Sequence, residues 1–245
     1  MPDPFPTAVV TGASRGFGRA IAAALVAAGT HVVGIARDEG QLRTVRDELG
    51  EGFRPVTADA TDDALAQDVI RTHRPTLLVL NAGVAPHMAP VHEQTWETFE
   101  RTWQVDTRHV FTWTRAALRE PLAPGSVVVA MSSMGAVAGS PRSGGYASAK
   151  AAIRFISRYA AAESTGAGLG IRFVTLLPRL TPTGIGAVGV AAYAAQQGVD
   201  RETFVEGLQP ILTPEHVAKS VLDLAGDPDS AAEYELTSAG PRRLG

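Results

Sequence analysis

Short apolar runs alternate with segments of helical length along almost the whole chain, and this alternation constrains the fold more than any other feature. The central runs are apolar at successive positions, as expected for parallel strands that helices cover on both faces. The predicted strands are Thr7–Val10, His31–Ala36, Phe53–Thr57, Thr76–Leu80, Ser126–Met131, Ile171–Leu177 and Tyr234–Thr237.

Helices are predicted in the intervals between these strands, and Gly29 and Gly50 stand where two of them are expected to stop. The alternation predicts a doubly wound α/β fold with a seven-stranded, mainly parallel sheet and ligands at the carboxyl ends of its strands. Because no repeat or linker interrupts the pattern, residues 1–245 are expected to form one domain. The expected helices span residues 17–28, 39–49, 62–73, 95–118 and 146–165.

The amino-acid composition indicates which kinds of molecule the protein binds. A hydrophobic content of 45% with a net charge of -3 is typical of a globular protein that binds small molecules, and no nucleic-acid partner is expected. The absence of cysteine removes thiolate chemistry and disulfides, and no metal site is expected. No apolar run reaches membrane-spanning length, and residues 1–6 do not resemble a secretion signal, so a cytoplasmic location is expected by default.

A glycine-rich turn follows the first predicted strand and opens the first predicted helix. Its spacing is G-x-x-x-G-x-G, which differs from the general dinucleotide fingerprint G-x-G-x-x-G. Backbone N–H groups at a helix N-terminus bind anions, and glycine lets the chain approach a pyrophosphate closely. The alternative is a purely structural turn. The candidate binding residues in the turn are Gly12, Ser14, Arg15, Gly16, Phe17 and Gly18.

The end of the second predicted strand bears on the choice between NAD and NADP. An acidic residue at this place binds the ribose hydroxyls and repels an added phosphate, whereas this chain has Ala36 and Arg37. Arg37 and Arg15 together can hold a 2′-phosphate through charge-assisted hydrogen bonds. We therefore predict NADP(H) as cofactor. The alternative is that both arginines are solvated surface charges.

Tyr146 and Lys150 lie four residues apart at the start of a predicted helix, so their side chains project from one face. An ammonium group beside a phenol stabilises the phenolate, which suits the hydroxyl to acid–base work. Ser133 follows a predicted strand at the carboxyl edge of the sheet, where its hydroxyl can donate to a substrate carbonyl oxygen. Tyr-x-x-x-Lys alone is common, and an exposed pair of side chains on a helix would explain it. The presence of Ser133 at the edge of the sheet favours a catalytic site instead.

Four motifs in this order resemble the short-chain dehydrogenase/reductase family: Thr11 to Gly18, Asn81-Ala82-Gly83, Ser133, and Tyr146-Ala147-Ser148-Ala149-Lys150. The resemblance covers roughly residues 7 to 183 and implies a Rossmann-type fold. It also implies that Tyr146 exchanges the proton, that Ser133 orients and polarises the carbonyl, and that Lys150 assists Tyr146 and binds the nicotinamide ribose.

The resemblance further assigns residues that contact the cofactor. Asp59 would sit by the adenine with Ala60 next to it, and Thr183 would contact the nicotinamide carboxamide. Turn structure is the alternative explanation for these positions. The full set beyond the glycine-rich turn and Arg37 is Asp59, Ala60, Asn81, Ala82, Gly83, Tyr146, Lys150, Pro178 and Thr183.

Two positions depart from the family pattern. Asp106 stands where the family has an asparagine that holds a water beside the catalytic lysine. A carboxylate can accept from a water but cannot donate, and its charge would strengthen the ammonium form of Lys150, so Asp106 is included among the catalytic residues. Arg179 stands where the family has glycine, and either binds an anionic substrate group or points to solvent.

Residues 184–208 occupy the family's variable substrate lid and contain Tyr193 and Phe204. Their Ala, Gly and Val content favours a hydrophobic substrate, although Ala-rich helix packing explains it equally well. Three tryptophans, Trp96, Trp103 and Trp113, fall in the predicted helix 95–118. Trp113 and Phe111 are expected to leave a second apolar face for another subunit, and the resemblance implies a homodimer or homotetramer.

These features predict an NADPH-dependent oxidoreductase that reduces the carbonyl of a small, hydrophobic ketone to an alcohol, or catalyses the reverse. One alternative is a cofactor-bound isomerase or lyase that has adapted the site around Asp106. Another is a regulatory protein that binds NADP without catalysis. The intact Ser133, Tyr146 and Lys150 argue against the regulatory protein, because a binding module has no need for a poised phenol.

Overall fold

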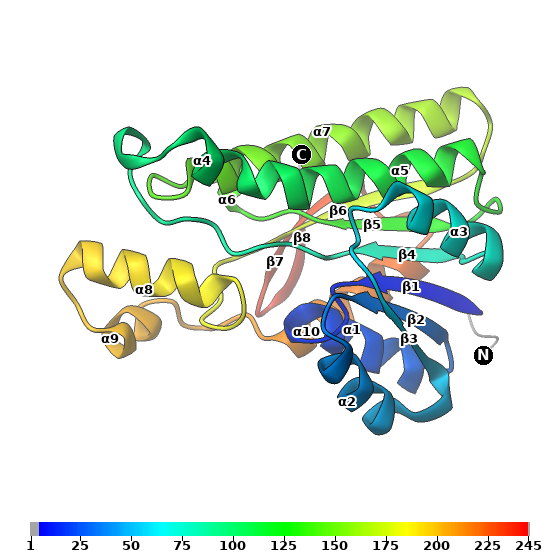
Figure 1. The fold of residues 1–245 in the computed structure, drawn as a ribbon, viewed down its shortest axis with the longest axis horizontal. Coiled ribbons are helices and arrows are strands. Elements are labelled where there is room, and N and C mark those ends of the chain that lie inside the picture. The colour runs from blue at the N-terminus through cyan, green and yellow to red at the C-terminus, as the bar shows by residue number, and fades with distance from the viewer. Residues whose placement is uncertain (1–4, 245) are drawn as a thin grey trace.

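The computed structural model describes residues 5–244, and an eight-stranded sheet lies between two layers of helices (Figure 1). The strand order is β3-β2-β1-β4-β5-β6-β7-β8, with β1 to β7 parallel and β8 antiparallel to β7. The strands are β1 Thr7–Thr11, β2 His31–Ala36, β3 Phe53–Thr57, β4 Leu77–Leu80, β5 Val127–Met131, β6 Arg172–Pro178, β7 Glu233–Thr237 and β8 Gly240–Arg243.

The expected doubly wound fold is confirmed, but the prediction of seven strands missed β8. This strand forms a short hairpin with β7, in which Thr237 Oγ1 donates to the Gly240 carbonyl at 2.9 Å. Its sequence is Gly-Pro-Arg-Arg, which has no apolar run because an exposed edge strand needs none. Only the backbone pairing with β7 identifies it as a strand.

Helices cover both faces of the sheet, as Figure 1 shows, with α1, α2 and α10 on one face and α3, α5 and α7 on the other. Alternate strand residues face opposite layers, so Val10 packs in one apolar cluster and Val9 in the other. No helix within residues 5–244 is long and apolar enough to cross a membrane. The α-helices are α1 Gly16–Ala27, α2 Glu39–Leu49, α3 Asp63–His73, α4 Trp96–Thr102, α5 Arg108–Arg119, α6 Gly135–Ala138, α7 Gly144–Gly166, α8 Gly186–Gln197, α9 Arg201–Glu206 and α10 Pro214–Gly226.

The segment predicted as one helix over 95–118 is three elements. After α4 the chain makes a π-helical turn, η3, at Trp103–Thr107, and then continues as α5. Such turns insert an extra residue into a helix and occur frequently at functional sites. Asp106 lies in this turn and is fully buried. A periodicity of 3.6 residues cannot reveal the insertion, because the apolar face continues on both sides of it.

The expectation that Trp113 belongs to an outward apolar face is wrong. Its side chain is fully buried in the core, and its indole Nε1 donates to the Ala60 carbonyl at 2.8 Å. Phe111, two residues earlier, is half exposed on α5. Residues two apart on a helix point in different directions, so one ring packs against the sheet while the other faces outward.

Candidate active site

A cavity of about 580 Å³ opens at the carboxyl edge of the sheet and is lined by the loops that follow β1 to β6. The sheet order reverses at β1, since β2 lies on one side of it and β4 on the other. Crevices at such reversals are the general binding place of doubly wound folds. Helix α8 supplies further lining residues, including Tyr193, from beyond the strand ends (Figure 1).

The glycine-rich turn folds tightly enough that two of its positions require glycine. Gly12 has a φ of +67°, which L side chains rarely adopt, and a Cβ on Gly18 would lie 2.2 Å from the Gly12 carbonyl oxygen. Arg15 occupies the N-cap of α1 without capping it, so the helix's first N–H groups have no side-chain acceptor. These features fit the pyrophosphate of a dinucleotide.

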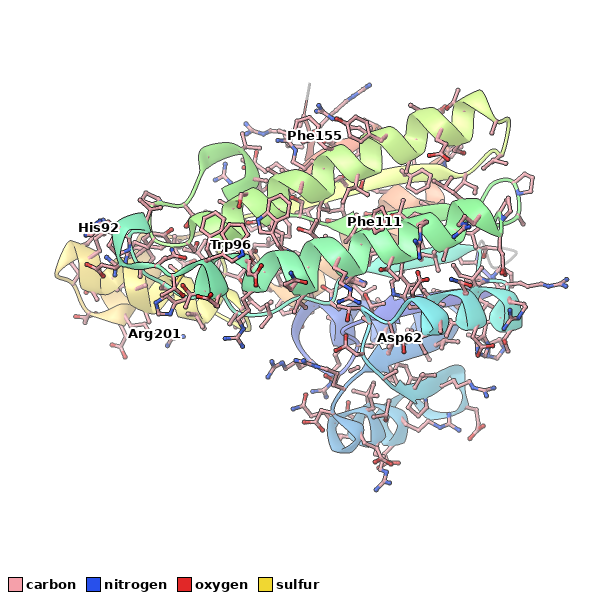
Figure 2. All side chains as sticks on the ribbon, turned by 45° about the horizontal axis from the view of Figure 1, so that its top comes forward. Asp62, His92, Trp96, Phe111, Phe155 and Arg201 are labelled. Carbon is pink, nitrogen blue, oxygen red and sulfur yellow. The ribbon has the colours of Figure 1, made fainter. Side chains whose placement is uncertain are left out.

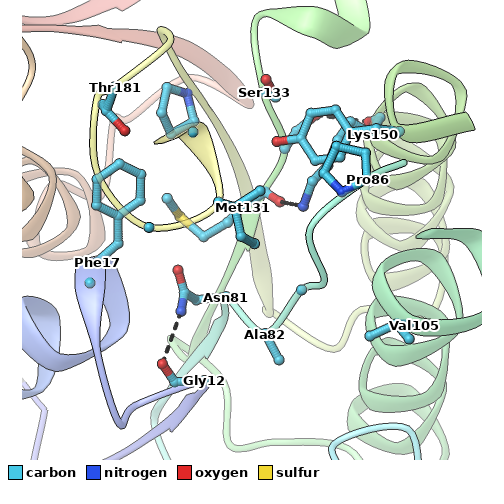
Figure 3. A pocket seen from close by; sticks show the side chains of 18 of the residues that line it. Gly12, Phe17, Asn81, Ala82, Pro86, Val105, Met131, Ser133, Lys150 and Thr181 are labelled. Carbon is cyan, nitrogen blue, oxygen red and sulfur yellow. Dashed lines mark hydrogen bonds between the residues drawn. The ribbon is translucent and has the colours of Figure 1, made fainter. Parts of the chain in front are cut away.

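Thr11 joins the ends of β1 and β4 beside this turn. Its hydroxyl accepts from the backbone N–H groups of Asn81, at 2.9 Å, and Ala82, at 3.1 Å. The Asn81 side-chain amide donates to the carbonyls of Thr11 and Gly12, at 3.1 and 3.4 Å, and Figure 3 marks the second of these bonds. The Asn81-Ala82-Gly83 segment is thereby held against the phosphate-binding turn.

A buried histidine completes this network, and the sequence interpretation missed it. His109 Nε2 lies 3.0 Å from Thr11 Oγ1. Because the threonine oxygen already accepts two N–H groups, its own proton is donated, and Nε2 at 3.0 Å is a closer acceptor than the Val79 carbonyl at 3.3 Å. The Nε2 atom of His109 thus faces the Thr11 hydroxyl, while its Nδ1 atom is buried without a hydrogen-bond partner among residues 5–244. Burial, and then the charge of Lys150, lower the pKa of His109 to about 3, against the opposing influence of Asp59 and the Ala82 carbonyl.

Ser133, Tyr146 and Lys150 all line the cavity. Ser133 follows β5, and its Oγ accepts from the Gly135 N–H at 3.1 Å, which orients the side chain. Tyr146 and Lys150 lie in the first two turns of α7, and Lys150 Nζ is 5.5 Å from the centre of the Tyr146 ring. Lys150 Nζ also donates to the Met131 carbonyl at 3.1 Å, the second dashed bond in Figure 3. The structure thus brings these three predicted residues together.

Asp106 forms an ion pair with the same lysine. Its Oδ2 lies 3.0 Å from Lys150 Nζ, and its Oδ1 accepts from the Val84 N–H at 2.9 Å. Burial is the largest influence on the pKa of Lys150 and lowers it, but the charges of Asp106 and Tyr146 and the hydrogen bond to Asp106 together raise it. The expected strengthening of the ammonium form is therefore present. Asp106 and Gly18 do not line the cavity themselves.

Arg15, in the turn before α1, and Arg37, directly after β2, both line the cavity, and neither forms an ion pair with another residue of the range 5–244. Asp38 follows Arg37, but its carboxylate accepts from the Gln41 N–H at 2.9 Å and caps α2. Hydrogen bonding from the Thr61 backbone is the main cause that lowers the pKa of Asp59, and the charge of Arg37 adds to it. Two unpaired guanidinium groups therefore border the site.

The remaining predicted cofactor residues also lie on the cavity wall. Figure 3 shows several of them around the opening, including Phe17, Asn81 and Ala82. Thr181, Ile35 and Met131 line it as well, and nothing in the local sequence pattern marked them. The predicted cofactor-binding residues on the wall are Gly12, Ser14, Arg15, Gly16, Phe17, Arg37, Asp59, Ala60, Asn81, Ala82, Gly83, Tyr146, Lys150, Pro178 and Thr183.

Arg179 lines the cavity, but its guanidinium group forms an ion pair with a carboxylate. Its Nε lies 2.5 Å from Oε1 of Glu235, a buried residue of β7 that also pairs with Arg242. Burial raises the pKa of Glu235, but hydrogen bonds and charges from the two arginines outweigh it and lower the pKa overall. The Arg179 side chain is 59% exposed, as the solvent-facing alternative expected, but its ion pair with the buried Glu235 was not expected.

The fold and the site together define a doubly wound protein with a dinucleotide crevice and a Ser, Tyr and Lys constellation at its edge. The model of the short chain dehydrogenase family matches residues 6–192. A cis-4-hydroxycyclohexanecarboxylate dehydrogenase from Sinomonas cyclohexanicum is 32% identical over 90% of this chain and 89% of its own length. The 3-oxoacyl-(acyl-carrier-protein) reductase of Salmonella typhimurium is 31% identical over 68% of this chain and 70% of its own.

Among solved structures, a 3-ketoacyl-(acyl-carrier-protein) reductase from Brucella melitensis in complex with NADH is similar in fold. The TM-score is 0.77 at 22% identity, and the match covers 94% of this chain and 95% of that one. The chain belongs to the short-chain dehydrogenase/reductase family. It is an oxidoreductase that uses a nicotinamide cofactor.

Proposed function

We propose that this protein is an NADPH-dependent ketoreductase with Tyr146 as its proton donor, and that the reaction is reversible. The observation that carries the proposal is the placement of Ser133, Tyr146 and Lys150 on the wall of the same cavity as the phosphate-binding turn. A dinucleotide held at that turn and a carbonyl held at Ser133 would meet beside the Tyr146 hydroxyl.

The roles of the side chains follow from their chemistry. A bound nicotinamide supplies or accepts the hydride. Ser133 donates a hydrogen bond to the substrate oxygen and polarises the carbonyl. Tyr146 gives its proton to the same oxygen during reduction and takes one back during oxidation. Lys150 stabilises the phenolate left on Tyr146, while Asp106 keeps Lys150 in the ammonium form.

The proposed preference for NADPH is supported by Arg15 and Arg37. Arg15 lies in the turn between β1 and α1 and Arg37 follows β2, and both are exposed and without an ion-pair partner among residues 5–244. A 2′-phosphate placed there would receive charge-assisted hydrogen bonds from two guanidinium groups. The use of Asp38 as a helix cap supports the same preference, since its carboxylate is engaged with Gln41 and not directed at a ribose.

The proposed substrate is a small ketone with an apolar body. Residues 184–208 form α8, α9 and the turns around them, and we propose that they act as the substrate lid of a single domain. The Sinomonas relative is named for cis-4-hydroxycyclohexanecarboxylate, and the ring of that substrate supports an alicyclic alcohol or ketone, whereas its carboxylate is not part of the substrate proposed here. The apolar residues on the cavity wall include Met88, Met134, Ala138, Leu180 and Ile185.

Steady-state oxidation of NADPH with a panel of ketones tests the function. Tyr146→Phe removes only the hydroxyl, and we expect kcat to fall at least about 100-fold, within the range of general acid catalysis. Tyr234→Phe removes the same atom from β7, where the hydroxyl accepts from the Ala231 N–H outside the cavity, and should retain activity. Full activity in Tyr146→Phe, or failure to bind any pyridine nucleotide, would overturn the proposal.

We also propose that the protein is a homodimer or homotetramer that buries the outer face of α5 and α7. A groove of about 320 Å³ runs between these helices, and its lining includes Leu118 and Ile156. Figure 2 labels Phe111 on α5 and Phe155 on α7, and both rings are about half exposed. Aromatic side chains gathered on two adjacent helices are typical of a surface that a second subunit covers.

A further inference from the structure

Three hydroxyl groups meet in the cavity, away from the glycine-rich turn. Ser140 precedes α7, Ser143 occupies its N-cap, and Tyr193 comes from α8. Ser140 Oγ lies 2.5 Å from Ser143 Oγ and is also within hydrogen-bond distance of the Tyr193 hydroxyl. All three residues line the same cavity as Tyr146, so the cluster belongs to the space that a substrate would fill.

Local structure does not explain the cluster. Serine at an N-cap normally accepts a hydrogen bond from its own helix, but the Ser143 side chain makes no such bond. It contacts Ser140 instead, although it is only 4% exposed. A favourable cap of α7 is therefore forgone, and the hydroxyl is directed toward the Ser140 and Tyr193 side chains.

The cluster has one more hydroxyl proton than its internal hydrogen bonds use. Three hydroxyls carry three protons, and the two contacts between them use two. None of the three makes a further side-chain hydrogen bond within the described residues 5–244. One donor therefore remains for an acceptor atom in the cavity.

The position of the cluster relative to the reacting centre follows from the helix. Ser143, the N-cap of α7, precedes Tyr146 by three residues, and both line the cavity, so the hydroxyl cluster lies within about one helical turn of Tyr146. A substrate whose carbonyl reaches Tyr146 can therefore extend along the cavity toward Ser143. The acceptor that fits would be an oxygen about one helical turn from the carbonyl.

We propose that the hydroxyls of Ser140, Ser143 and Tyr193 bind a second, hydrogen-bond-accepting oxygen of the substrate, so that the preferred substrate is an oxygenated ketone or its alcohol. This inference rests on the proposed ketoreductase function and specifies its substrate class. The apolar residues nearby contact the substrate body, and the hydroxyl cluster sets its orientation.

Matched pairs of ketones test this specificity. Each pair has an alkyl member and an ether member of similar size, for example 4-methylcyclohexanone and 4-methoxycyclohexanone, whose ether oxygen lies across the ring from the carbonyl. Linear and aryl pairs of the same design complete the panel. For the wild type we expect kcat/KM about 10-fold higher for the ether member of at least one pair, which is the effect of one hydrogen bond.

Tyr193→Phe and Ser143→Ala should each abolish that preference by raising KM for the ether ketone, while kcat/KM for the alkyl ketone changes by no more than about twofold. Tyr234→Phe, outside the cavity, should keep the wild-type ratio. Equal losses for both members of a pair would mean that Tyr193 only closes the lid, and the proposal would be overturned. A wild type without preference in any pair would also refute it, whereas no reduction of any ketone with NADPH or NADH would refute the function itself.

Discussion

Replacing Asp106 by asparagine tests how the proton-donating site is tuned. The carboxylate lies 3.0 Å from Lys150 Nζ, and both side chains are almost fully buried. At an effective dielectric constant of about 20, two unit charges at this distance attract by about 5 kcal/mol. Without the Asp106 charge, we expect the pKa of Lys150 to fall, because burial then dominates.

The pH dependence in the wild type follows from the direction of this shift. The folded-state pKa of Lys150 is raised, so the stability contributed by the pair is complete below the unfolded value near 10.4 and is lost as pH rises through the folded pKa. In Asp106→Asn that contribution is absent at neutral pH. We expect the free energy of unfolding to fall by about 3 kcal/mol, the usual cost of breaking a buried pair.

Two measurements check these values: kcat/KM for ketone reduction against pH, and urea unfolding at pH 7. The alkaline limb should move to lower pH by at least about 1 unit in Asp106→Asn, because Lys150 then loses its ammonium form at a lower pH. The chain's other lysine provides the control, since Lys219 pairs with Asp223 on the exposed face of α10. Asp223→Asn should change stability by at most about 0.5 kcal/mol and leave the profile unaltered. If Asp106→Asn behaves like Asp223→Asn in both assays, Asp106 does not hold Lys150 in the ammonium form.

Three other predictions concern the rest of the site and the outer face. Because the pKa of His109 is about 3 in the folded chain and near 6.5 in the unfolded chain, stability falls with pH below 6.5, and between pH 7 and 5 His109 should account for about 2 kcal/mol. Urea titrations at both pH values should show a smaller difference for His109→Gln, and an equal difference would contradict the assignment. Arg37→Ala should raise KM for NADPH about 10- to 100-fold and leave KM for NADH unchanged, while a similar effect on both would show that the arginine does not select the phosphate. Phe111→Asp should lower the sedimenting mass to that of a monomer, and a monomeric wild type would rule out the proposed interface.

Structural features that depend on residues close together in the sequence could be predicted without a structure. The Tyr146 and Lys150 side chains share a face because helical geometry places residues four apart together. The glycine-rich turn could be located because it lies between an apolar run and a helical segment. The doubly wound sheet follows from the same alternation, since parallel strands need crossover helices.

Tertiary structure decided the features that depend on pairs distant in the chain. Thr11 and His109 are 98 residues apart, and the contact between Ser140 and Tyr193 spans 53. Asp106 was recognised as unusual from its position, but its direct ion pair with Lys150 arises from the π-helical turn that precedes α5.

The burial of Trp113 and the pairing of Arg179 with Glu235 have the same origin. An indole, a guanidinium or an imidazole can face solvent or the interior with little change in the local sequence pattern. The choice depends on which donors, acceptors and charges the packed elements bring within reach, here the Ala60 carbonyl and the Glu235 carboxylate. Local periodicity therefore determined the framework of this protein, while contacts between distant segments determined its electrostatics and the polar end of its substrate cavity.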